Sequence, residues 1–213
     1  MSENLQSITE LGNPKKPHGE AGKEMLSDMN EHHSAVTAWG IGFLELCGKE
    51  RVLDIGCGGG AALKRMASQI TSGHLTGVDY SPLSVEMSRK HNADAISDGK
   101  MDITSGSVEA LPFDNESFDR IITVESFYFW PDPDKDLREV FRVLAKGGKF
   151  LIVADINGDA QLTTEEEANV RKYELFNPTA SQLRDMLANA GFSDIAIHKK
   201  EGTNWICAEG NKQ

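Results

Sequence analysis

The stretch Val52-Leu53-Asp54-Ile55-Gly56-Cys57-Gly58-Gly59-Gly60 decides the fold of this chain. Its first half is an apolar run with one acidic residue, typical of a buried strand, and its second half is a glycine loop. A helix is predicted directly after the loop, because four apolar residues follow at helical spacing, namely Leu63, Met66, Ala67 and Ile70. This order of strand, loop and helix predicts a site where the backbone approaches a nucleotide-like ligand closely.

The charges around the loop narrow the choice of ligand. The spacing Gly56-x-Gly58-x-x-Ala61 fits the dinucleotide fingerprint, so a nicotinamide-dependent oxidoreductase stays open at this point. However, Asp54 lies two residues before the first glycine, and the next basic residue along the chain is Lys64. A pyrophosphate would rely on backbone N–H groups and a helix dipole while facing that carboxylate. A ligand with an ammonium and a sulfonium group, and no phosphate, fits better.

Residues 52–60 resemble motif I of the class I S-adenosylmethionine-dependent methyltransferases, in which an acidic residue precedes G-x-G-x-G. The later motifs resemble the small-molecule, methyltransferase-domain 11/25-like branch of this family. The resemblance implies that Asp54 lies near the methionine ammonium, and that Gly56, Cys57 and Gly58 lie along the amino-acid and ribose parts of S-adenosylmethionine. It also implies S-adenosylhomocysteine as the product.

A second motif, Leu75-Thr76-Gly77-Val78-Asp79, is a short apolar strand that ends in an acid. Asp79 follows Gly58 at about the separation expected for a ribose-binding carboxylate. Tyr80 and Ser81 are expected beside the cofactor as well. In addition, Ser81-Pro82 predicts a helix start, with serine as the N-cap and proline at the first helical position.

A third motif, residues 106–113, resembles the adenine-binding loop of the small-molecule branch. The position of Ser107 is often an aspartate there, so this chain departs from the family pattern. A serine hydroxyl accepts a hydrogen bond without charge assistance. The resemblance implies contacts from Ser107, from the backbone of Val108 and from Glu109.

The acceptor side is predicted where the fourth motif ends. Residues 117–125 form a buried strand, and the run Ser126-Phe127-Tyr128-Phe129-Trp130-Pro131 follows beside the expected methyl group. Phe127 and Phe129 fit the core, whereas Tyr128 and Trp130 fit either the core or the pocket. A carboxylate such as Glu125 at the end of a buried strand is unusual unless it is paired or functional, so it is also expected near the cofactor.

Helices before the first strand lie over the cofactor in similar methyltransferases and shape the acceptor pocket. The expected substrate and lid residues are therefore Met29, His33, Trp39, Tyr128 and Trp130. An acceptor that must lose a proton would use Glu125, His33 or Tyr128 as a general base. Residues 1–22 are expected to be mostly loop, with a helix from Lys23 to Leu46.

The remaining pattern completes an α/β fold. Leu137, Val140, Phe141 and Leu144 mark a helix face that stops at Gly147-Gly148, before a strand at residues 149–154. Thr179-x-x-Gln182 is a capping box that opens another helix, and strands follow at residues 193–198 and 204–208. These elements predict a Rossmann-like, doubly wound sheet of seven strands with helices on both faces and a terminal antiparallel hairpin. The expected division is 1–34, tail and start of the lid helix, and 35–213, the methyltransferase domain.

Composition excludes several classes of function. A net charge of −11 over 213 residues disfavours a nucleic-acid partner. Three scattered cysteines predict neither a disulfide framework nor a thiolate zinc site, and with no apolar run long enough for a membrane span they indicate the cytoplasm. No metal is expected, because His32 and His33 are neighbours on one predicted helix and so do not share a face. Cys57 fits a small apolar filler of the loop.

Together the four ordered motifs predict a methyltransferase that acts on a small molecule by in-line displacement. Two alternatives remain, an oxidoreductase that binds NAD and a catalytically silent protein that binds S-adenosylmethionine. The sequence names neither the acceptor nor an oligomeric state.

Overall fold

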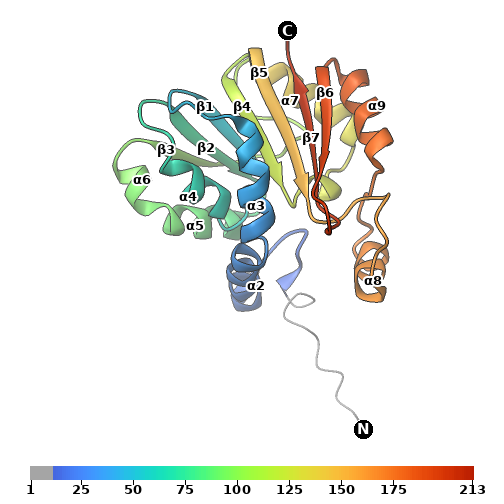
Figure 1. The fold of residues 1–213 in the computed structure, drawn as a ribbon. Helices are drawn as coiled ribbons and strands as arrows, with labels where there is room; N and C mark the ends of the chain where they lie inside the picture. Colours follow the sequence, from blue (N-terminus) through green and yellow to red (C-terminus); the bar gives the residue numbers. More distant parts are fainter. Residues whose placement is uncertain (1–11) are drawn as a thin grey trace.

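The computed structural model describes residues 12–213, which form a sheet flanked by helices on both faces (Figure 1). Its elements are α2 (Gly19–His32), α3 (Ser34–Ile41), η1 (Gly42–Leu44), β1 (Arg51–Ile55), α4 (Ala61–Ala67), β2 (His74–Asp79), α5 (Pro82–His91), α6 (Ala93–Ser97), β3 (Met101–Ser105), β4 (Phe118–Val124), η2 (Phe127–Phe129), α7 (Pro133–Val143), β5 (Leu144–Ala154), α8 (Thr164–Lys172), α9 (Ala180–Ala190), β6 (Ser193–Lys199) and β7 (Ile206–Asn211). None of the helices in this described part is both long and apolar enough to cross a bilayer.

The sheet has seven strands in the order β3-β2-β1-β4-β5-β7-β6. The first five are parallel, whereas β7 runs antiparallel to both β5 and β6. The predicted doubly wound sheet and its antiparallel hairpin are therefore confirmed. Chain order reverses between β1 and β4, and at such a switch point the carboxyl ends of the strands leave a crevice for a ligand.

Neighbouring residues of β1 show how the sheet is buried on both sides. Val52 packs into the core under α3, α4 and α5, and Leu53 packs into the core under α7 and α9. Both side chains are completely buried. Alternate residues of a strand point to opposite faces, so a strand covered on both faces is apolar throughout. This makes the single acid in β1, Asp54, conspicuous.

Two predicted helix starts are confirmed at the atomic level. The Oγ of Ser81 accepts a hydrogen bond from Ser84 N, with Pro82 at the first position of α5. The capping box of α9 is formed by Thr179 and Gln182, and the helix ends at Gly191 in the left-handed conformation. Local side-chain chemistry fixes where these helices begin.

Other boundaries differ from the predictions. The expected single helix begins at Gly19, earlier than Lys23, and breaks after His32, because His33 has φ −86° and ψ 5° between α2 and α3. Leu144 begins β5 rather than ending α7, since it pairs with Phe118 of β4. The last strand begins at Ile206, two residues later than predicted. Helix α8 was not predicted at all. The expectation for residues 1–11 lies outside the described residues.

Candidate functional site

The glycine loop joins β1 to α4 through three left-handed residues. Gly56, Gly58 and Gly60 have φ of +71°, +50° and +81°. A Cβ on Gly56 would overlap the side chain of Ser126. The backbone N–H groups of Gly56 and Cys57 both donate to the carbonyl of Val78, at 2.8 and 3.1 Å. These contacts fix the loop against the end of β2, in a conformation that favours glycine.

Asp54 is the buried acid behind this loop. Its side chain is 1% exposed, and among the described residues its Oδ2 has no hydrogen-bond partner. Burial, with a further contribution from the charge of Asp79, raises the pKa of Asp54 to about 7. A buried carboxylate without a partner is costly, and a cation beside it removes that cost. The buried carboxylate of Asp54 thus fits a ligand with a positive group, such as an ammonium.

Asp79 lies at the tip of β2 and faces the same space. Its two oxygens accept hydrogen bonds from Gly58 N at 2.9 Å and from Ser81 N at 2.8 Å. Burial raises the pKa of this carboxyl as well. Each oxygen keeps a lone pair for a ligand hydroxyl, because a carboxylate accepts about four hydrogen bonds. Backbone therefore holds Asp79 in place and leaves acceptor capacity free.

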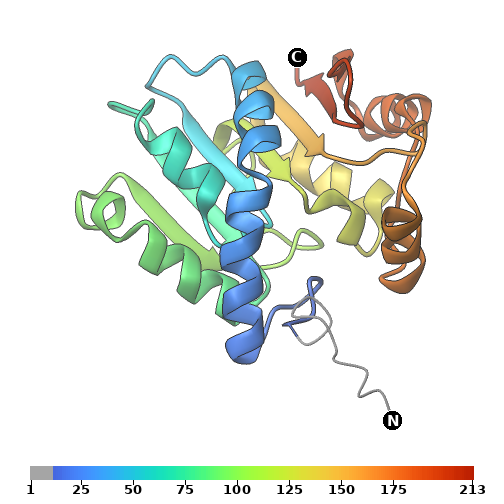
Figure 2. The ribbon, with the colours of Figure 1, turned by 60° about the horizontal axis from the view of Figure 1, so that its bottom comes forward.

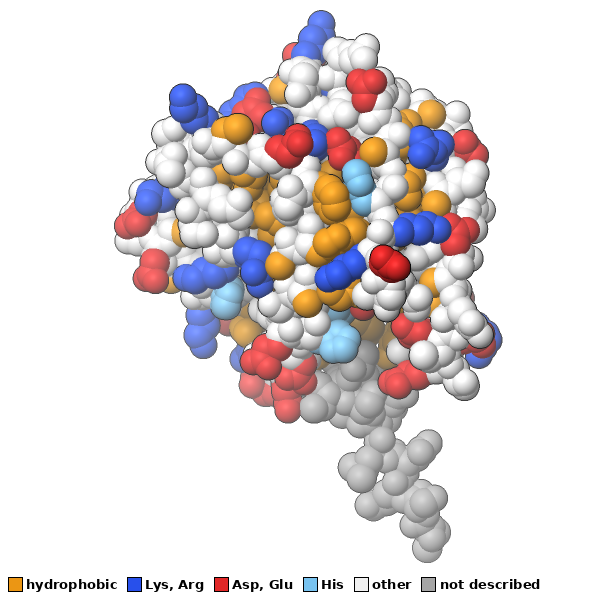
Figure 3. All heavy atoms as spheres, viewed as in Figure 1, with side chains coloured by type: hydrophobic (Ala, Val, Ile, Leu, Met, Phe, Trp, Pro, Cys, Tyr) orange, Lys and Arg blue, Asp and Glu red, His pale blue; other side chains and the backbone are white. Residues whose placement is uncertain are grey.

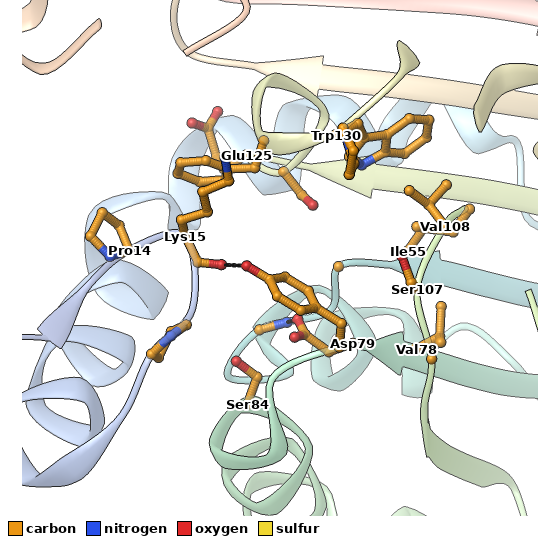
Figure 4. A pocket seen from close by; sticks show the side chains of 18 of the residues that line it. Pro14, Lys15, Ile55, Val78, Asp79, Ser84, Ser107, Val108, Glu125 and Trp130 are labelled. Carbon is orange, nitrogen blue, oxygen red and sulfur yellow. Dashed lines mark hydrogen bonds between the residues drawn. The ribbon is translucent and has the colours of Figure 1, made fainter. Parts of the chain in front are cut away.

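A cavity of about 180 Å³ opens between Asp79 and the third motif (Figure 4). Ile55, Val78, Val108 and Trp130 supply apolar walls. Tyr80 also lines this first cavity, and its hydroxyl donates to the carbonyl of Lys15. The result is a narrow apolar slot with a carboxylate at one end.

The third motif, residues 106–113, forms one side of the first cavity. It lies opposite the N-terminal turn that contains Pro14 and Lys15 (Figure 4). Ser107, Val108 and Glu109 all line this cavity. The Ser107 hydroxyl donates to Glu109 Oε2 at 3.0 Å and accepts from Glu109 N at 3.3 Å. The hydroxyl is thus engaged in its own loop, which leaves less of it for a ligand.

A second, smaller cavity of about 80 Å³ lies on the other side of the glycine loop. Asp54, Gly56, Gly58 and Glu125 line it from the sheet, and Met29 lines it from α2. Because Asp79 lines the first cavity and Asp54 lines the adjoining second one, one elongated ligand can contact both carboxylates. The first and second cavities share five lining residues, Leu26, Met29, Gly56, Gly58 and Glu125.

Glu125 joins these cavities to a polar cluster. It has a left-handed backbone with φ +53°, unusual for a residue other than glycine. Its carboxylate accepts from Tyr128 Oη at 2.8 Å and from Asp155 N at 2.6 Å. Burial raises the pKa of Glu125 well above its ordinary value, with Asp155 adding to the shift. Burial also raises the pKa of Tyr128.

His33 reaches the same cluster from the junction between α2 and α3. Its Nε2 lies 3.9 Å from Glu125 Oε2 and 3.8 Å from Asp155 Oδ2. Burial lowers the pKa of His33, against the opposing effect of Asp155. The imidazole is therefore biased toward its neutral form, which can accept a proton.

A third cavity, of about 380 Å³, lies beyond this cluster. It is enclosed by α2, by the aromatic turn η2 and by residues in and after α8, and Figures 1 and 2 show α2 and α8 on opposite sides of this end of the sheet. Met29 and His33 line both the second and the third cavity, and Tyr128 and Phe129 form the floor of the third. These residues bring the expected donor and acceptor regions together.

Two expected site residues lie elsewhere. Ser81 is completely buried, and its hydroxyl accepts from Ser84 N and donates to the Pro17 carbonyl at 3.1 Å, so it supports Asp79 without lining a cavity. Trp39 packs against Phe43 and Trp205, with ring centroids 5.2 and 6.0 Å away, and lines none of the three cavities. Trp39 thus packs against the core under α3, whereas Thr37 of the same helix lines the second cavity.

Two further expected residues combine packing with a place at a cavity. Trp130 both lines the first cavity and packs on Phe127, with ring centroids 4.9 Å apart. Cys57 lines the second cavity and is buried, and burial raises the pKa of its thiol well above the ordinary value. A neutral buried thiol is a poor nucleophile.

Among the residues of the site that were not predicted, three carry polar side chains close to the carboxylates. Ser84 and Ser126 line the first cavity, and Asp155 lies against Glu125 and His33. Asp155 directly follows the apolar strand β5, which is the signal that identified Asp79 at the end of β2. A search for an acid at the carboxyl end of every apolar strand would have found Asp155.

The surface around the site carries charges of both signs. On the face seen in Figure 3, Lys and Arg side chains are scattered among Asp and Glu, and no broad basic area is visible. A phosphate backbone needs clustered cations. This face therefore offers little to a nucleic acid.

Residues 53–152 match the profile of a family described as a methyltransferase domain. This part of the chain is a methyltransferase domain similar to those of the class I S-adenosylmethionine-dependent enzymes. It is 28% identical over 155 residues to 2-methyl-6-phytyl-1,4-hydroquinone methyltransferase 1, chloroplastic, of Oryza sativa subsp. japonica, covering 73% of this chain and 44% of the relative. It is 25% identical over 175 residues to the uncharacterized methyltransferase YdaC of Bacillus subtilis strain 168, covering 81% and 87%.

A solved structure agrees in fold. Phosphoethanolamine N-methyltransferase 2 of Haemonchus contortus in complex with S-adenosyl-L-methionine superposes with a TM-score of 0.72 at 18% identity, over 83% of this chain and 52% of that one. At this identity the likeness shows the fold alone. The chain spans less than half the length of the rice relative.

Proposed function

We propose that this protein transfers a methyl group from S-adenosylmethionine to a small-molecule acceptor bound in the third cavity. The observation that carries the proposal is Asp54, which is buried beside the glycine loop and whose Oδ2 has no hydrogen-bond partner among the described residues. Such a group suits a cationic ligand and opposes a pyrophosphate. Nothing in the site favours the NAD-dependent oxidoreductase.

The residues divide along the length of the donor. Asp54 would hold the methionine ammonium, Asp79 the ribose hydroxyls, and Val108 with Ile55 the adenine, each from its place around the first two cavities. The sulfonium would then lie near Glu125, where the first and second cavities meet. When bound, the donor supplies an already activated methyl group, so the protein's main task is to position the acceptor in line with the sulfur–methyl bond.

The acceptor would enter from the third cavity, whose lining is mixed. Met25, Met29, Phe129 and Leu175 offer an apolar surface, and Asp28 and Asn169 offer polar groups. This combination suits a small amphipathic molecule, in keeping with the hydroquinone in the rice relative's name. The methyl group forms a bond to the acceptor atom as its bond to sulfur breaks. A proton lost by the acceptor would pass to His33, to Glu125, or through the Tyr128 hydroxyl to Glu125.

Isothermal titration of the full-length protein with S-adenosylmethionine and S-adenosylhomocysteine tests the donor site. Asp54→Asn should weaken binding about tenfold to a hundredfold, because a hydrogen bond to a charged group contributes roughly 1.5–3 kcal/mol. The matched control is Asp102→Asn, whose side chain is 77% exposed on β3 and should leave binding unchanged. Absence of binding by the folded protein contradicts the proposal, and binding of NADH instead would support the oxidoreductase.

Methyl transfer is tested separately from binding. The protein is incubated with radiolabelled donor and a panel of hydroquinones, amines and fatty acids, and labelled product is counted. Donor binding with no transfer to any acceptor would favour the catalytically silent alternative.

We also propose the cytoplasm as the compartment, since Cys47, Cys57 and Cys207 are all free thiols.

A further inference from the structure

The two adjacent histidines at the end of α2 lie differently from what their sequence predicts. On one continuous helix, neighbouring side chains point to different sides, and the expectation of no metal site rested on that geometry. However, α2 ends at His32, His33 has a non-helical backbone, and α3 begins at Ser34. The break brings the two rings edge to face, with centroids 5.2 Å apart. The premise of a single helix is therefore wrong.

A carboxylate completes this pair. His32, His33 and Asp155 each offer one ligand atom, and the three atoms lie within 4.8 Å of one another. The closest measured pair is His33 Nε2 and Asp155 Oδ2, at 3.8 Å. Two ligands that each lie about 2.1 Å from one tetrahedral ion are about 3.4 Å apart. A side-chain movement of less than about 1 Å would bring His33 Nε2 and Asp155 Oδ2 to that spacing.

The surroundings support a cation at this point. Asp155 is held by its own backbone, whose N–H donates to Glu125 Oε1 at 2.6 Å. A second carboxylate oxygen, Glu125 Oε2, lies 3.9 Å from His33 Nε2, and Asp28 lines the same cavity as both histidines. Two imidazoles and one carboxylate form a mixed nitrogen and oxygen set, which suits Zn²⁺, Co²⁺, Ni²⁺ or Fe²⁺ better than Mg²⁺.

We propose that His32, His33 and Asp155 bind one divalent first-row transition-metal ion at the wall of the third cavity. Both histidines line that cavity, so the coordination positions that the protein leaves open face its occupant. The ion would bind an oxygen or nitrogen atom of that occupant and act on it as a Lewis acid. With His33 engaged as a ligand, the Tyr128–Glu125 pair remains for the proton.

The ion is tested by titration of the full-length protein, freed of any affinity tag, with CoCl₂ in the absence of a methyl donor. Visible absorption should show one equivalent of Co²⁺ bound through nitrogen and oxygen, and calorimetry should show that ZnCl₂ displaces it while MgCl₂ does not. His32→Ala and Asp155→Asn should each weaken Co²⁺ binding by at least about tenfold, the lower end of what even outer partners of a metal site contribute. His32 is exposed, so its replacement leaves the core intact.

The matched control is His74→Ala. His74 also contacts a carboxylate, Asp102, at 2.9 Å, but lies at the amino end of β2, on the opposite edge of the sheet. Its replacement should leave the Co²⁺ spectrum unchanged. Equal binding by His32→Ala, Asp155→Asn and the unaltered protein would overturn the proposal and leave a metal-free histidine–carboxylate contact. Because no donor is present, failure of the proposed methyl transfer would not alter either result.

Discussion

The buried Asp54 makes the ligand-free protein less stable as the pH rises. Folding raises the pKa of this carboxyl from its ordinary value of 3.8 to about 7. Below the pKa that Asp54 has in the unfolded chain, its carboxyl is protonated in both the folded and the unfolded state, and no stability is lost. As the pH rises toward 7 the unfolded chain ionises first, so the folded state loses about 4 kcal/mol, since each pKa unit corresponds to about 1.36 kcal/mol.

Asp54→Asn removes this titration while keeping the shape of the side chain. Between pH 5 and pH 8 the stability advantage of the variant over the unaltered protein should grow by about 2–3 kcal/mol. Urea unfolding followed by circular dichroism at the two pH values measures it. The decisive quantity is how the difference in unfolding free energy between the two proteins changes with pH. Any effect of replacing an oxygen by an amide that is the same at both pH values drops out of this change.

Two comparisons make this prediction specific. Asp102→Asn, on the exposed edge of the sheet, should show the same pH dependence as the unaltered protein. Saturating S-adenosylhomocysteine should stabilise the unaltered protein more than Asp54→Asn at pH 8, because a bound ammonium offsets the buried charge. If the unfolding free energies of Asp54→Asn and the unaltered protein run parallel from pH 5 to pH 8, then Asp54 is not held near neutrality and the argument for a cation site is lost.

Three further predictions follow from single contacts. Gly56→Ala places a Cβ at φ +71° and against Ser126, so thermal unfolding should show a loss of at least about 1–2 kcal/mol, together with loss of donor binding by calorimetry. Tyr128→Phe removes the 2.8 Å hydrogen bond to Glu125; methyl-transfer assays should show a lower kcat, with calorimetric donor affinity unchanged, and an unchanged kcat would contradict a role in the reaction. Leu187→Ala opens the core under α9, where Leu187 is fully buried, and should cost about 2–5 kcal/mol in urea unfolding without altering donor affinity; a change in affinity would show coupling that the fold does not predict.

The grouping of Asp54, Asp79 and the glycine loop around two adjoining cavities could be predicted from sequence because the relevant signals are local. Asp54 and Asp79 stand out as acids in or at the end of apolar strands, and the intervening glycines mark backbone that other residues adopt at a cost. Such signals need only a few neighbouring residues. The sheet topology follows from the same alternation of strands and helices.

The acceptor side depends on tertiary packing and could not be predicted as well. The break at His33 lies in the segment His32-His33-Ser34, which contains neither glycine nor proline. Helix α8 buries none of its residues, so it has no apolar periodicity to detect, although Thr163 and Glu166 form a capping box. Trp39 belongs to a helix that is apolar on several sides. Hydrophobic periodicity therefore does not predict which residues pack against Trp39.

Ser81 shows how two local predictions can conflict. An N-cap hydroxyl accepts from the backbone of its own helix, here from Ser84 N. The same hydroxyl donates to the Pro17 carbonyl, and Ser81 lines none of the three cavities. The capping signal was therefore sufficient to exclude Ser81 from the cavity and to direct attention to Ser84.

The N-terminal turn bears on how quickly the protein can turn over. Pro14, Lys15 and Pro17 line the first cavity, and two hydrogen bonds, Tyr80 to the Lys15 carbonyl and Ser81 to the Pro17 carbonyl, attach this turn to the start of α5. A spent cofactor leaving on this side has to break both, at roughly 0.5–1.5 kcal/mol each. Opening of this turn would therefore add a step to the exchange of a cofactor bound in the first cavity.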